Sequence, residues 1–168
     1  FSRPSHLVAP DLIGCSLIKR ISKNKYLSGV IVETEAYSQE EASCHGFKSK
    51  TKRNETLFGE PGNLYVYVSY GIYNCVNVVT GKSNWANGVL LRSLAIKGEN
   101  ERIASGPGLL AKRFGFNTNH NNLFLSPDND FWLTKGAPKH KIGEIVQTTR
   151  IGISQAKDIR WRWYLKSC

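Results

Sequence analysis

A run of twenty residues without a charged side chain, Pro61–Thr80, constrains the fold of this chain more than any other segment. Residues 64–68 and 72–79 within it are rich in Val, Ile and Tyr, and Ser69-Tyr70-Gly71 separates them. β-Branched and aromatic residues favour strands, and a short turn that contains Gly between two such runs is typical of a β-hairpin. The segment therefore predicts two antiparallel strands, which makes a β-sheet the framework of the fold.

The remaining elements are predicted from the same kinds of pattern. Apolar runs predict strands over residues 16–21, 27–37 and 89–95, a short extended piece over 131–133, and extended segments over 142–153 and 161–166. Residues 38–60 are expected to form a loop with a short helix. Ser105 is the expected N-cap of a helix that runs to about Phe114, with Pro107 in its first turn. Together these elements predict a mostly antiparallel β fold with a few short helices.

Length and cysteine spacing define the broad class. A chain of 168 residues is expected to form one domain over residues 1–168. It has no Met and ends at a cysteine, so its numbering need not begin or end at the natural termini. No run of 18 apolar residues occurs, and we therefore expect no membrane-spanning helix and no membrane partner. The cysteines lie far apart, which favours free thiols in a reducing, intracellular compartment: Cys15, Cys44, Cys75 and Cys168.

The charge balance indicates an acidic partner. Lys and Arg number 23 against 13 Asp and Glu, a net charge of +10, and a basic domain attracts polyanions, of which nucleic acid is the commonest. Residues 131–168 carry eight of the basic side chains and two acidic ones: Lys135, Lys139, Lys141, Arg150, Lys157, Arg160, Arg162 and Lys166 against Glu144 and Asp158. This basic tail is either a phosphate-facing surface or a solvated face, and the pattern does not decide between them.

The first chemical feature is a pair of glutamates in the strand expected over residues 27–37. Side chains alternate across a strand, so Glu33, Glu35 and Tyr37 share one face. Two acids on one face of a β-branched strand are uncommon, because burial of charge is costly and like charges repel. In a cleft, a carboxylate can act as a general base on water or stabilise a developing cation. The alternative is two solvent-facing or salt-bridged glutamates on an edge strand.

The second feature is the concentration of tyrosines in the hairpin. Tyr65 and Tyr67 lie on one face of its first strand, Tyr70 sits at the turn, and Asn77 lies within the second strand. An aromatic side chain at an exposed turn has no core to fill, but it can wedge between bases, and inward-facing tyrosines can stack on a planar base. The alternative is that Tyr65, Tyr67 and Tyr73 are ordinary strand tyrosines.

Other catalytic motifs are missing from the sequence. Cys44-His45 follows Glu40-Glu41, but no further His or Cys lies at metal-ligand spacing, so we expect no metal site and treat His45 from the residues alone as a structural histidine. No G-x-S-x-G elbow and no Walker sequence occurs, which argues against serine-hydrolase and P-loop chemistry.

A set of short motifs spans nearly the whole chain in a fixed order: Asp11-Leu-Ile-Gly14, Ile31-Val-Glu-Thr-Glu-Ala-Tyr37, Lys52-Arg-Asn54, Pro61-Gly62, Leu64-Tyr-Val-Tyr67, Tyr70-Gly71, Val89-Leu-Leu-Arg92, Ser105-Gly-Pro107 and Arg150-Ile-Gly152. In this order they resemble the alkyladenine (3-methyladenine) DNA glycosylase family. The combination of ETEAY, LYVY and LLR is far more specific than any single piece.

The resemblance implies a single α+β domain with a curved, mostly antiparallel sheet, short surrounding helices and a protruding hairpin that enters the DNA minor groove. It implies a monofunctional base-excision-repair enzyme without metal or cofactor. Such an enzyme flips 3-methyladenine, 7-methylguanine, hypoxanthine or ethenoadenine out of duplex DNA and hydrolyses the N-glycosidic bond, leaving an abasic site. A monomer in the bacterial cytoplasm, or in a nucleus, is the corresponding expectation.

The resemblance also assigns the chemical residues. Glu35 matches the general base that aligns and deprotonates water, Arg92 matches the arginine near that water, and the carbonyl of Ile151 matches the position that also holds it. Because the strand face alone could not choose between the two acids, it is the family pattern that selects Glu35 and leaves Glu33 as a structural or electrostatic neighbour.

The base-binding residues are carried over in the same way. Tyr37, His45 and Tyr67 match the residues that sandwich the flipped base. Tyr70 matches the side chain inserted into the vacated stack, and Asn77 matches the residue whose bulk opposes the exocyclic amino group of guanine.

Two other function classes stay open at this point. A noncatalytic single-stranded nucleic-acid-binding module would share the basic charge and the exposed tyrosines, but it would have no use for Glu33 and Glu35 on the stacking face. A nuclease would need metal carboxylates and would be silenced by EDTA, whereas the glycosylase would not.

Overall fold

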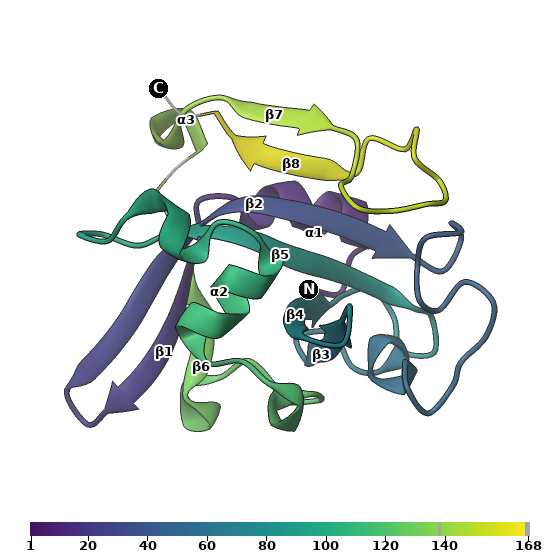
Figure 1. The fold of residues 1–168 in the computed structure, drawn as a ribbon, viewed down its shortest axis with the longest axis horizontal. Helices are drawn as coiled ribbons and strands as arrows, with labels where there is room; N and C mark the ends of the chain where they lie inside the picture. The colour runs from purple at the N-terminus through teal and green to yellow at the C-terminus, as the bar shows by residue number, and fades with distance from the viewer. Residues whose placement is uncertain (138, 167–168) are drawn as a thin grey trace.

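The computed structural model describes residues 1–137 and 139–166, and within them the chain forms one eight-stranded sheet with helices on both faces (Figure 1). The strands are β1 (Ser16–Ser22), β2 (Lys25–Ser38), β3 (Leu64–Ser69), β4 (Tyr73–Val79), β5 (Asn87–Ala95), β6 (Phe131–Thr134), β7 (Ile145–Thr148) and β8 (Arg162–Leu165). Every pairing between these strands is antiparallel. The α+β, single-domain class predicted from the sequence is confirmed.

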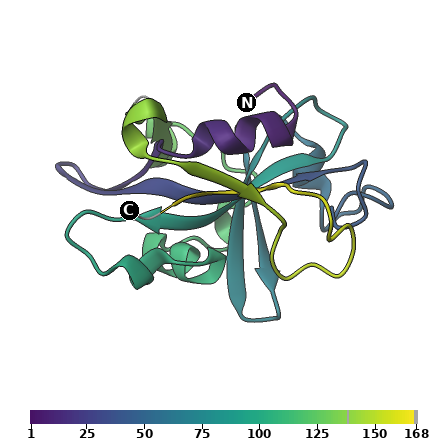
Figure 2. The ribbon, with the colours of Figure 1, turned by 90° about the horizontal axis from the view of Figure 1, so that it is seen from above.

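The helices are short and surround the sheet. The α-helices are α1 (Ser5–Leu12), α2 (Pro107–Phe114) and α3 (Lys139–Ile142). The 3-10 helices are η1 (Glu55–Phe58), η2 (Glu101–Ala104), η3 (Thr118–His120) and η4 (Pro127–Asn129). Seen from above, α1 covers one face of the central strands, while α2 and the β3–β4 hairpin lie on the opposite side, where the hairpin projects from the sheet (Figure 2).

The long strand β2 is the centre of the sheet. Six strands follow the order β3-β4-β5-β2-β1-β6, while β8 pairs with β2 and β7 pairs with β8. One edge of β2 pairs with β5 along residues 30–38. The other edge is shared, because residues 25–30 pair with β1 and residues 33–35 pair with β8. The two glutamates of β2 therefore lie in the interior of the sheet between β5 and β8, which contradicts the edge-strand alternative.

The main core lies on the α1 side and between the sheet and α2, where apolar side chains such as Leu17, Ile31, Leu91, Leu110 and Phe114 are fully buried. Burial of such side chains contributes about 1.5–3 kcal/mol each. A smaller cluster closes the far end of the sheet beneath η1: Cys44, Leu57, Phe58, Tyr65, Val79 and Ala86, with Tyr37 and Tyr67 packed against it. This second cluster supports the loop that leads from β2 into the hairpin.

Three details differ from the sequence-based expectation. The N-cap of α2 is Gly106, not Ser105, because Gly106 has a φ of 100° and turns the chain sharply before Pro107 enters the helix. The extended segment expected over 142–153 is a strand only in β7. Helix α1 was not predicted, since Pro10 lies inside its eight residues and Pro disfavours a helix interior.

Candidate active site

A row of side chains across four strands forms the floor of a cavity. The register pairs Tyr65 of β3 with Asn77 of β4, Asn77 with Leu90 of β5, and Leu90 with Glu35 of β2. Paired residues in antiparallel strands point to the same face, so these four side chains lie side by side. The cavity above them has a volume of about 440 Å³. That is within the size of small-molecule sites, about 300–1,000 Å³.

The cavity wall combines polar groups with apolar and aromatic surface. It is lined by Glu35, Tyr37, Ser43, His45, Leu57, Tyr65, Tyr67, Ser69, Tyr70, Cys75, Leu90, Arg92, Pro107, Ile151, Gly152 and Ile153. Seven of the eight residues that the sequence assigned to the site are in this wall. They come from β2, β3, β5, the hairpin turn, the loop after β2 and the loop before β8.

Glu35 is the buried acid of the cavity, with its side chain 0% exposed. Oε2 accepts a hydrogen bond from the Tyr37 hydroxyl at 2.8 Å and lies 3.4 Å from Nη1 of Arg92. Oε1 accepts the backbone N–H of Ile151 at 2.8 Å. A carboxylate has about four lone-pair sites. Among the described residues, these two hydrogen bonds take one lone-pair site on each oxygen, and Arg92 approaches Oε2 as an ion pair. A site on Oε1, beside the Ile151 N–H, is left for a further donor.

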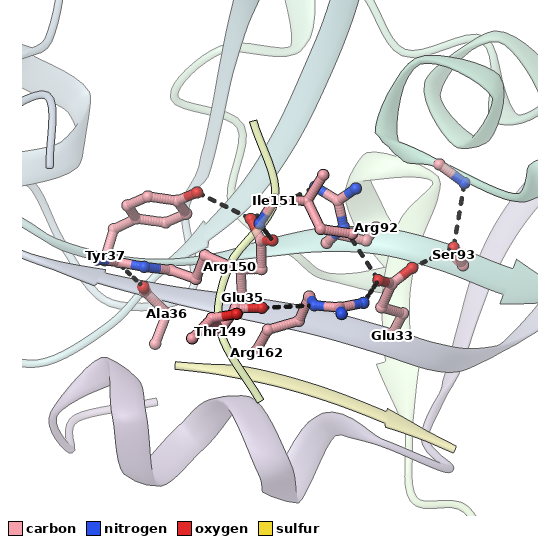
Figure 3. A network of polar contacts seen from close by, with 11 residues as sticks. Glu33, Glu35, Ala36, Tyr37, Arg92, Ser93, Thr149, Arg150, Ile151 and Arg162 are labelled. Carbon is pink, nitrogen blue, oxygen red and sulfur yellow. Dashed lines mark hydrogen bonds and ion pairs between the residues drawn. The ribbon is translucent and has the colours of Figure 1, made fainter. Parts of the chain in front are cut away.

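Glu33 and Arg92 form a second layer around Glu35 (Figure 3). Oε1 of Glu33 receives Nε of Arg92 at 3.2 Å and Nη1 of Arg162 at 2.8 Å, and Oε2 receives the Ser93 hydroxyl at 2.8 Å. Burial raises the pKa of Glu33, but the hydrogen bonds and charges of these partners outweigh it, so this pKa lies below the usual range. The β2–β5 pairing shifts register on both sides of Glu33, but residues 33–35 pair with β8 without a shift, and Arg92 contacts both glutamates.

Tyr37 is fixed from behind by a buried ion pair. The guanidinium of Arg150 lies 4.7 Å from the centre of the Tyr37 ring and pairs with both carboxylate oxygens of Glu41, at 2.8 and 3.0 Å. Arg150 also donates to the carbonyls of Ala36 and Ala156. Burial and the neighbouring Glu35 charge raise the pKa of Tyr37, so its hydroxyl stays protonated and keeps donating to Glu35.

His45, Tyr65 and Tyr67 form an aromatic cluster in the cavity wall. The rings of His45 and Tyr67 meet nearly edge to face, with centroids 4.6 Å apart, and Nδ1 of His45 is 2.9 Å from the Tyr65 hydroxyl. Partial burial and the positive charge of Arg53 lower the pKa of His45, so the ring is neutral at physiological pH. Burial raises the pKa of Tyr65 to about 12. Tyr65 was not among the predicted site residues, although its place on the same strand face as Tyr67 was the available signal.

Tyr70 occupies the tip of the β3–β4 hairpin and is 84% exposed. Its φ of 49° is positive, as is that of Gly71, and the Ile72 N–H donates to the Ser69 carbonyl across the turn. A bulky residue in this backbone region is strained, and such strain concentrates at functional positions. The neighbouring Ile72 and Tyr73 are exposed as well, so the projecting tip is apolar.

Asn77 is the one predicted site residue that the structure does not place in the cavity wall. It is 5% exposed, and its side-chain amide donates to the Tyr65 carbonyl at 3.1 Å. Because it lies in the floor row between Tyr65 and Leu90, it supports the wall from below. Ile151 does line the cavity. Its contact with Glu35 is made by the backbone N–H, whereas the role expected for its carbonyl, holding the water, stays a prediction.

The basic tail is not one uniform surface. Arg150 is buried under Tyr37, Arg162 pairs with Glu33, and Lys166 pairs with Glu144. The reading of residues 131–168 as a single phosphate-facing or solvated face is therefore wrong for Arg150, whose buried partner Glu41 lies 109 residues away. The side chain of Lys139 and the residue Cys168 are outside the described part of the chain.

The described residues contain no metal-binding cluster and no membrane-spanning helix. In the ranges 1–137 and 139–166, no group of three or more His, Cys, Asp and Glu side chains could hold a metal ion. Among the helices that the structure describes, none combines the length and apolar character needed to cross a membrane.

Comparison with known proteins places the chain in a family. The family model described as "Methylpurine-DNA glycosylase" matches residues 1–168. A protein of Trichodesmium erythraeum is 40% identical over 183 residues, which cover 99% of this chain and 91% of the relative. A protein of Carboxydothermus hydrogenoformans is 41% identical over 179 residues, with coverage of 99% and 93%. Both carry the name "Putative 3-methyladenine DNA glycosylase". The resemblance drawn from the motifs is confirmed, and the chain belongs to the methylpurine-DNA glycosylase family.

Proposed function

We propose that this DNA glycosylase flips an alkylated or deaminated purine out of duplex DNA into the 440 Å³ cavity and hydrolyses its N-glycosidic bond with a water activated by Glu35. The observation that carries the proposal is the fully buried Glu35 carboxylate in the cavity wall, which two hydrogen bonds and the Arg92 guanidinium hold in place while one site on Oε1 remains for water. The substrates are 3-methyladenine, 7-methylguanine, hypoxanthine and ethenoadenine.

The chemistry is a single displacement by water without a covalent enzyme intermediate. The water oxygen bonds to C1′ while the bond between C1′ and the base nitrogen breaks, and the bonding electron pair leaves with the base. One water proton passes to the Glu35 carboxylate. The sugar develops oxocarbenium character, which the anion stabilises because both are held in a site with little water. Arg92 and the Ile151 backbone orient the carboxylate and the water. No lyase step follows, and the product is an abasic site.

Stacking of the flipped base on aromatic side chains offsets the free energy that base flipping costs. Extrusion of a base costs a few kcal/mol, and least for a lesion that weakens pairing. Stacking on aromatic side chains contributes about 1–3 kcal/mol per base. We assign this role to Tyr37, His45 and Tyr67. The rings of His45 and Tyr67 touch edge to face, so a base stacked between them requires one ring to turn.

Two further residues complete the proposal. Tyr70 fills the gap that the flipped nucleotide leaves, since it stands at the tip of a projecting, apolar hairpin. Asn77 opposes the amino group of guanine from beneath the cavity wall, where its amide donates to the Tyr65 carbonyl. The enzyme works as a monomer in the compartment that holds DNA, the nucleoid of a bacterium or a nucleus.

The Glu35→Gln variant tests the proposal. Single-turnover excision is measured in EDTA on duplexes that carry one 7-methylguanine, hypoxanthine or ethenoadenine, with alkali to reveal abasic sites. We expect the variant to bind lesion DNA like the parent but to lose excision by about 10²–10⁴-fold, the range of general-base catalysis. Glu40→Gln is the matched control, because Glu40 is exposed on the loop after β2.

Three results would contradict the proposal. Unchanged excision by Glu35→Gln would remove Glu35 from its role. Loss of activity of the parent in EDTA would favour a metal-dependent nuclease. Salt-sensitive binding without excision on any of the lesions, or on methylated DNA, would favour a nucleic-acid-binding module.

A further inference from the structure

Glu33 is a charged, mostly buried residue that the proposed chemistry does not use. Its side chain is 15% exposed, and it lies beside the cavity without lining it. A buried carboxylate is costly unless its partners are fixed. Glu33 has such partners in Arg92, Arg162 and Ser93.

Arg92 is divided between the two glutamates of β2. Its Nε lies 3.2 Å from Oε1 of Glu33, and its Nη1 lies 3.4 Å from Oε2 of Glu35. An arginine and a carboxylate that meet freely tend to form a bidentate pair with N···O distances of about 2.7–2.9 Å. The single, longer contact with Glu35 is not such a pair, and Nε of Arg92 donates to Glu33 instead.

A bidentate pair between Arg92 and Glu35 would block the site on Glu35 that the water needs. A bridge from Arg92 would use both oxygens of Glu35. In the described residues Oε1 of Glu35 already accepts from Ile151, so the bridge would take its last open lone-pair site. That site is the one that would accept the proton of the attacking water.

Glu33 is itself held by neighbouring elements. Nη1 of Arg162 on β8 lies 2.8 Å from Oε1, and the Ser93 hydroxyl on β5 lies 2.8 Å from Oε2. The Ser93 hydroxyl in turn accepts the N–H of Gly106 at 3.1 Å, directly before Pro107 in the cavity wall. Hydrogen bonds therefore connect the Glu33 carboxylate to β8 and β5 and, through Ser93, to the start of α2 (Figure 3).

We propose that Glu33 is a positioning residue of the excision reaction: it anchors Arg92 so that Glu35 keeps an open site for the attacking water. The inference rests on the proposed function. It predicts that loss of the Glu33 charge lowers the rate of the chemical step and does so through Arg92.

A double-mutant cycle tests this coupling. The parent, Glu33→Gln, Arg92→Met and the double variant are compared by the single-turnover excision rate at saturating enzyme, with the dissociation constant for lesion DNA measured separately. We expect Glu33→Gln to lower the rate of the parent at least about tenfold, the size of a misplaced catalytic group, with less than about a twofold change in binding. In the Arg92→Met background the same substitution changes the rate by less than about twofold, because residues that act as a unit are not additive.

A matched control separates positioning from general loss of an ion pair. Glu99→Gln removes another arginine-paired glutamate, the partner of Arg113, and neither residue lines the cavity. We expect it to leave the excision rate unchanged. An unchanged rate for Glu33→Gln in the parent, or an equal loss in both backgrounds, would overturn the inference while the proposed function stands. An inactive parent would overturn the proposed function instead.

If Glu33→Gln melts below the assay temperature, Ser93→Ala carries the test. It removes one contact of Glu33 without changing the charge. We expect a smaller rate loss that again vanishes in the Arg92→Met background, whereas an equal loss in both backgrounds would overturn the inference.

Discussion

Glu41→Gln is expected to destabilise the protein strongly, because it breaks a buried ion pair. The side chains of Arg150 and Glu41 are 0% and 4% exposed, and two hydrogen bonds join them. The Ser43 N–H and hydroxyl also donate to Glu41. The glutamine keeps the shape of the side chain but loses its charge, and its amide N–H₂ meets a guanidinium that has only donors.

The size of the effect follows from the contacts that remain. Removal of one partner of a buried pair costs about 3–5 kcal/mol. Arg150 keeps the carbonyls of Ala36 and Ala156 as acceptors, so the lower value, about 3 kcal/mol, applies. For a protein of this size each kcal/mol lowers Tm by about 2–4 °C, which gives a fall of about 6–12 °C.

Thermal unfolding followed by circular dichroism at pH 7 measures this fall. Glu144→Gln is the control, because Glu144 and its partner Lys166 are 65% and 61% exposed, and an exposed pair contributes about 0–1 kcal/mol. A Glu41→Gln variant that melts within about 2 °C of the parent, as the control should, would refute the reasoning. Because Arg150 also backs the Tyr37 ring, the variant should lose excision as well at temperatures where it is folded.

Two further predictions concern the hairpin tip and pH. Tyr70→Gly should leave Tm within about 3 °C of the parent, since the side chain is 84% exposed and glycine relieves the positive φ. It should nevertheless weaken single-turnover excision by about tenfold, since the stacking side chain is lost, whereas Tyr26→Ala, at an exposed position near the start of β2, should not. For Glu41, burial raises the pKa but the Arg150 and Ser43 hydrogen bonds outweigh it, so the folded pKa lies below the unfolded value of about 4.3. Its stabilisation is complete above that value and is lost as pH falls through the folded pKa. The difference in free energy of unfolding between the parent and Glu41→Gln, measured in urea at several pH values, should therefore shrink below about pH 4, and a constant difference would contradict the assignment.

The sheet could be predicted from local pattern, while its connections could not. The runs that form β1 to β5 carry their own signals of alternation, turns and β-branched residues, and these strands appear close to the predicted bounds. The division of β2 between β1 and β8 on one edge depends on Trp163 and its neighbours, far along the chain. No spacing within β2 encodes which distant strand completes it.

The candidate site shows the same limit at the level of single residues. From the strand alone, Glu33 and Glu35 were equivalent, and only the resemblance to a family separated them. In the structure they differ in their partners, since Glu35 accepts the N–H of Ile151 from 116 residues away and Glu33 accepts Arg162 from 129 residues away. The chemistry of an acid is set by these donors, so it becomes visible only when the chain is folded.

Net charge was least informative where the chain is most basic. A count of residues 131–168 gives a net charge of +6. Arg150 and Arg162, however, form ion pairs with Glu41 and Glu33, so their charges are largely neutralised and attract an approaching polyanion little. Tyr70 was predictable for the opposite reason. Its exposure depends on a turn of four residues, which the sequence specifies locally. A local turn therefore predicts the exposure of Tyr70, whereas the partners of Glu33 and Glu35 come from more than 100 residues along the chain and could not be predicted from the strand alone.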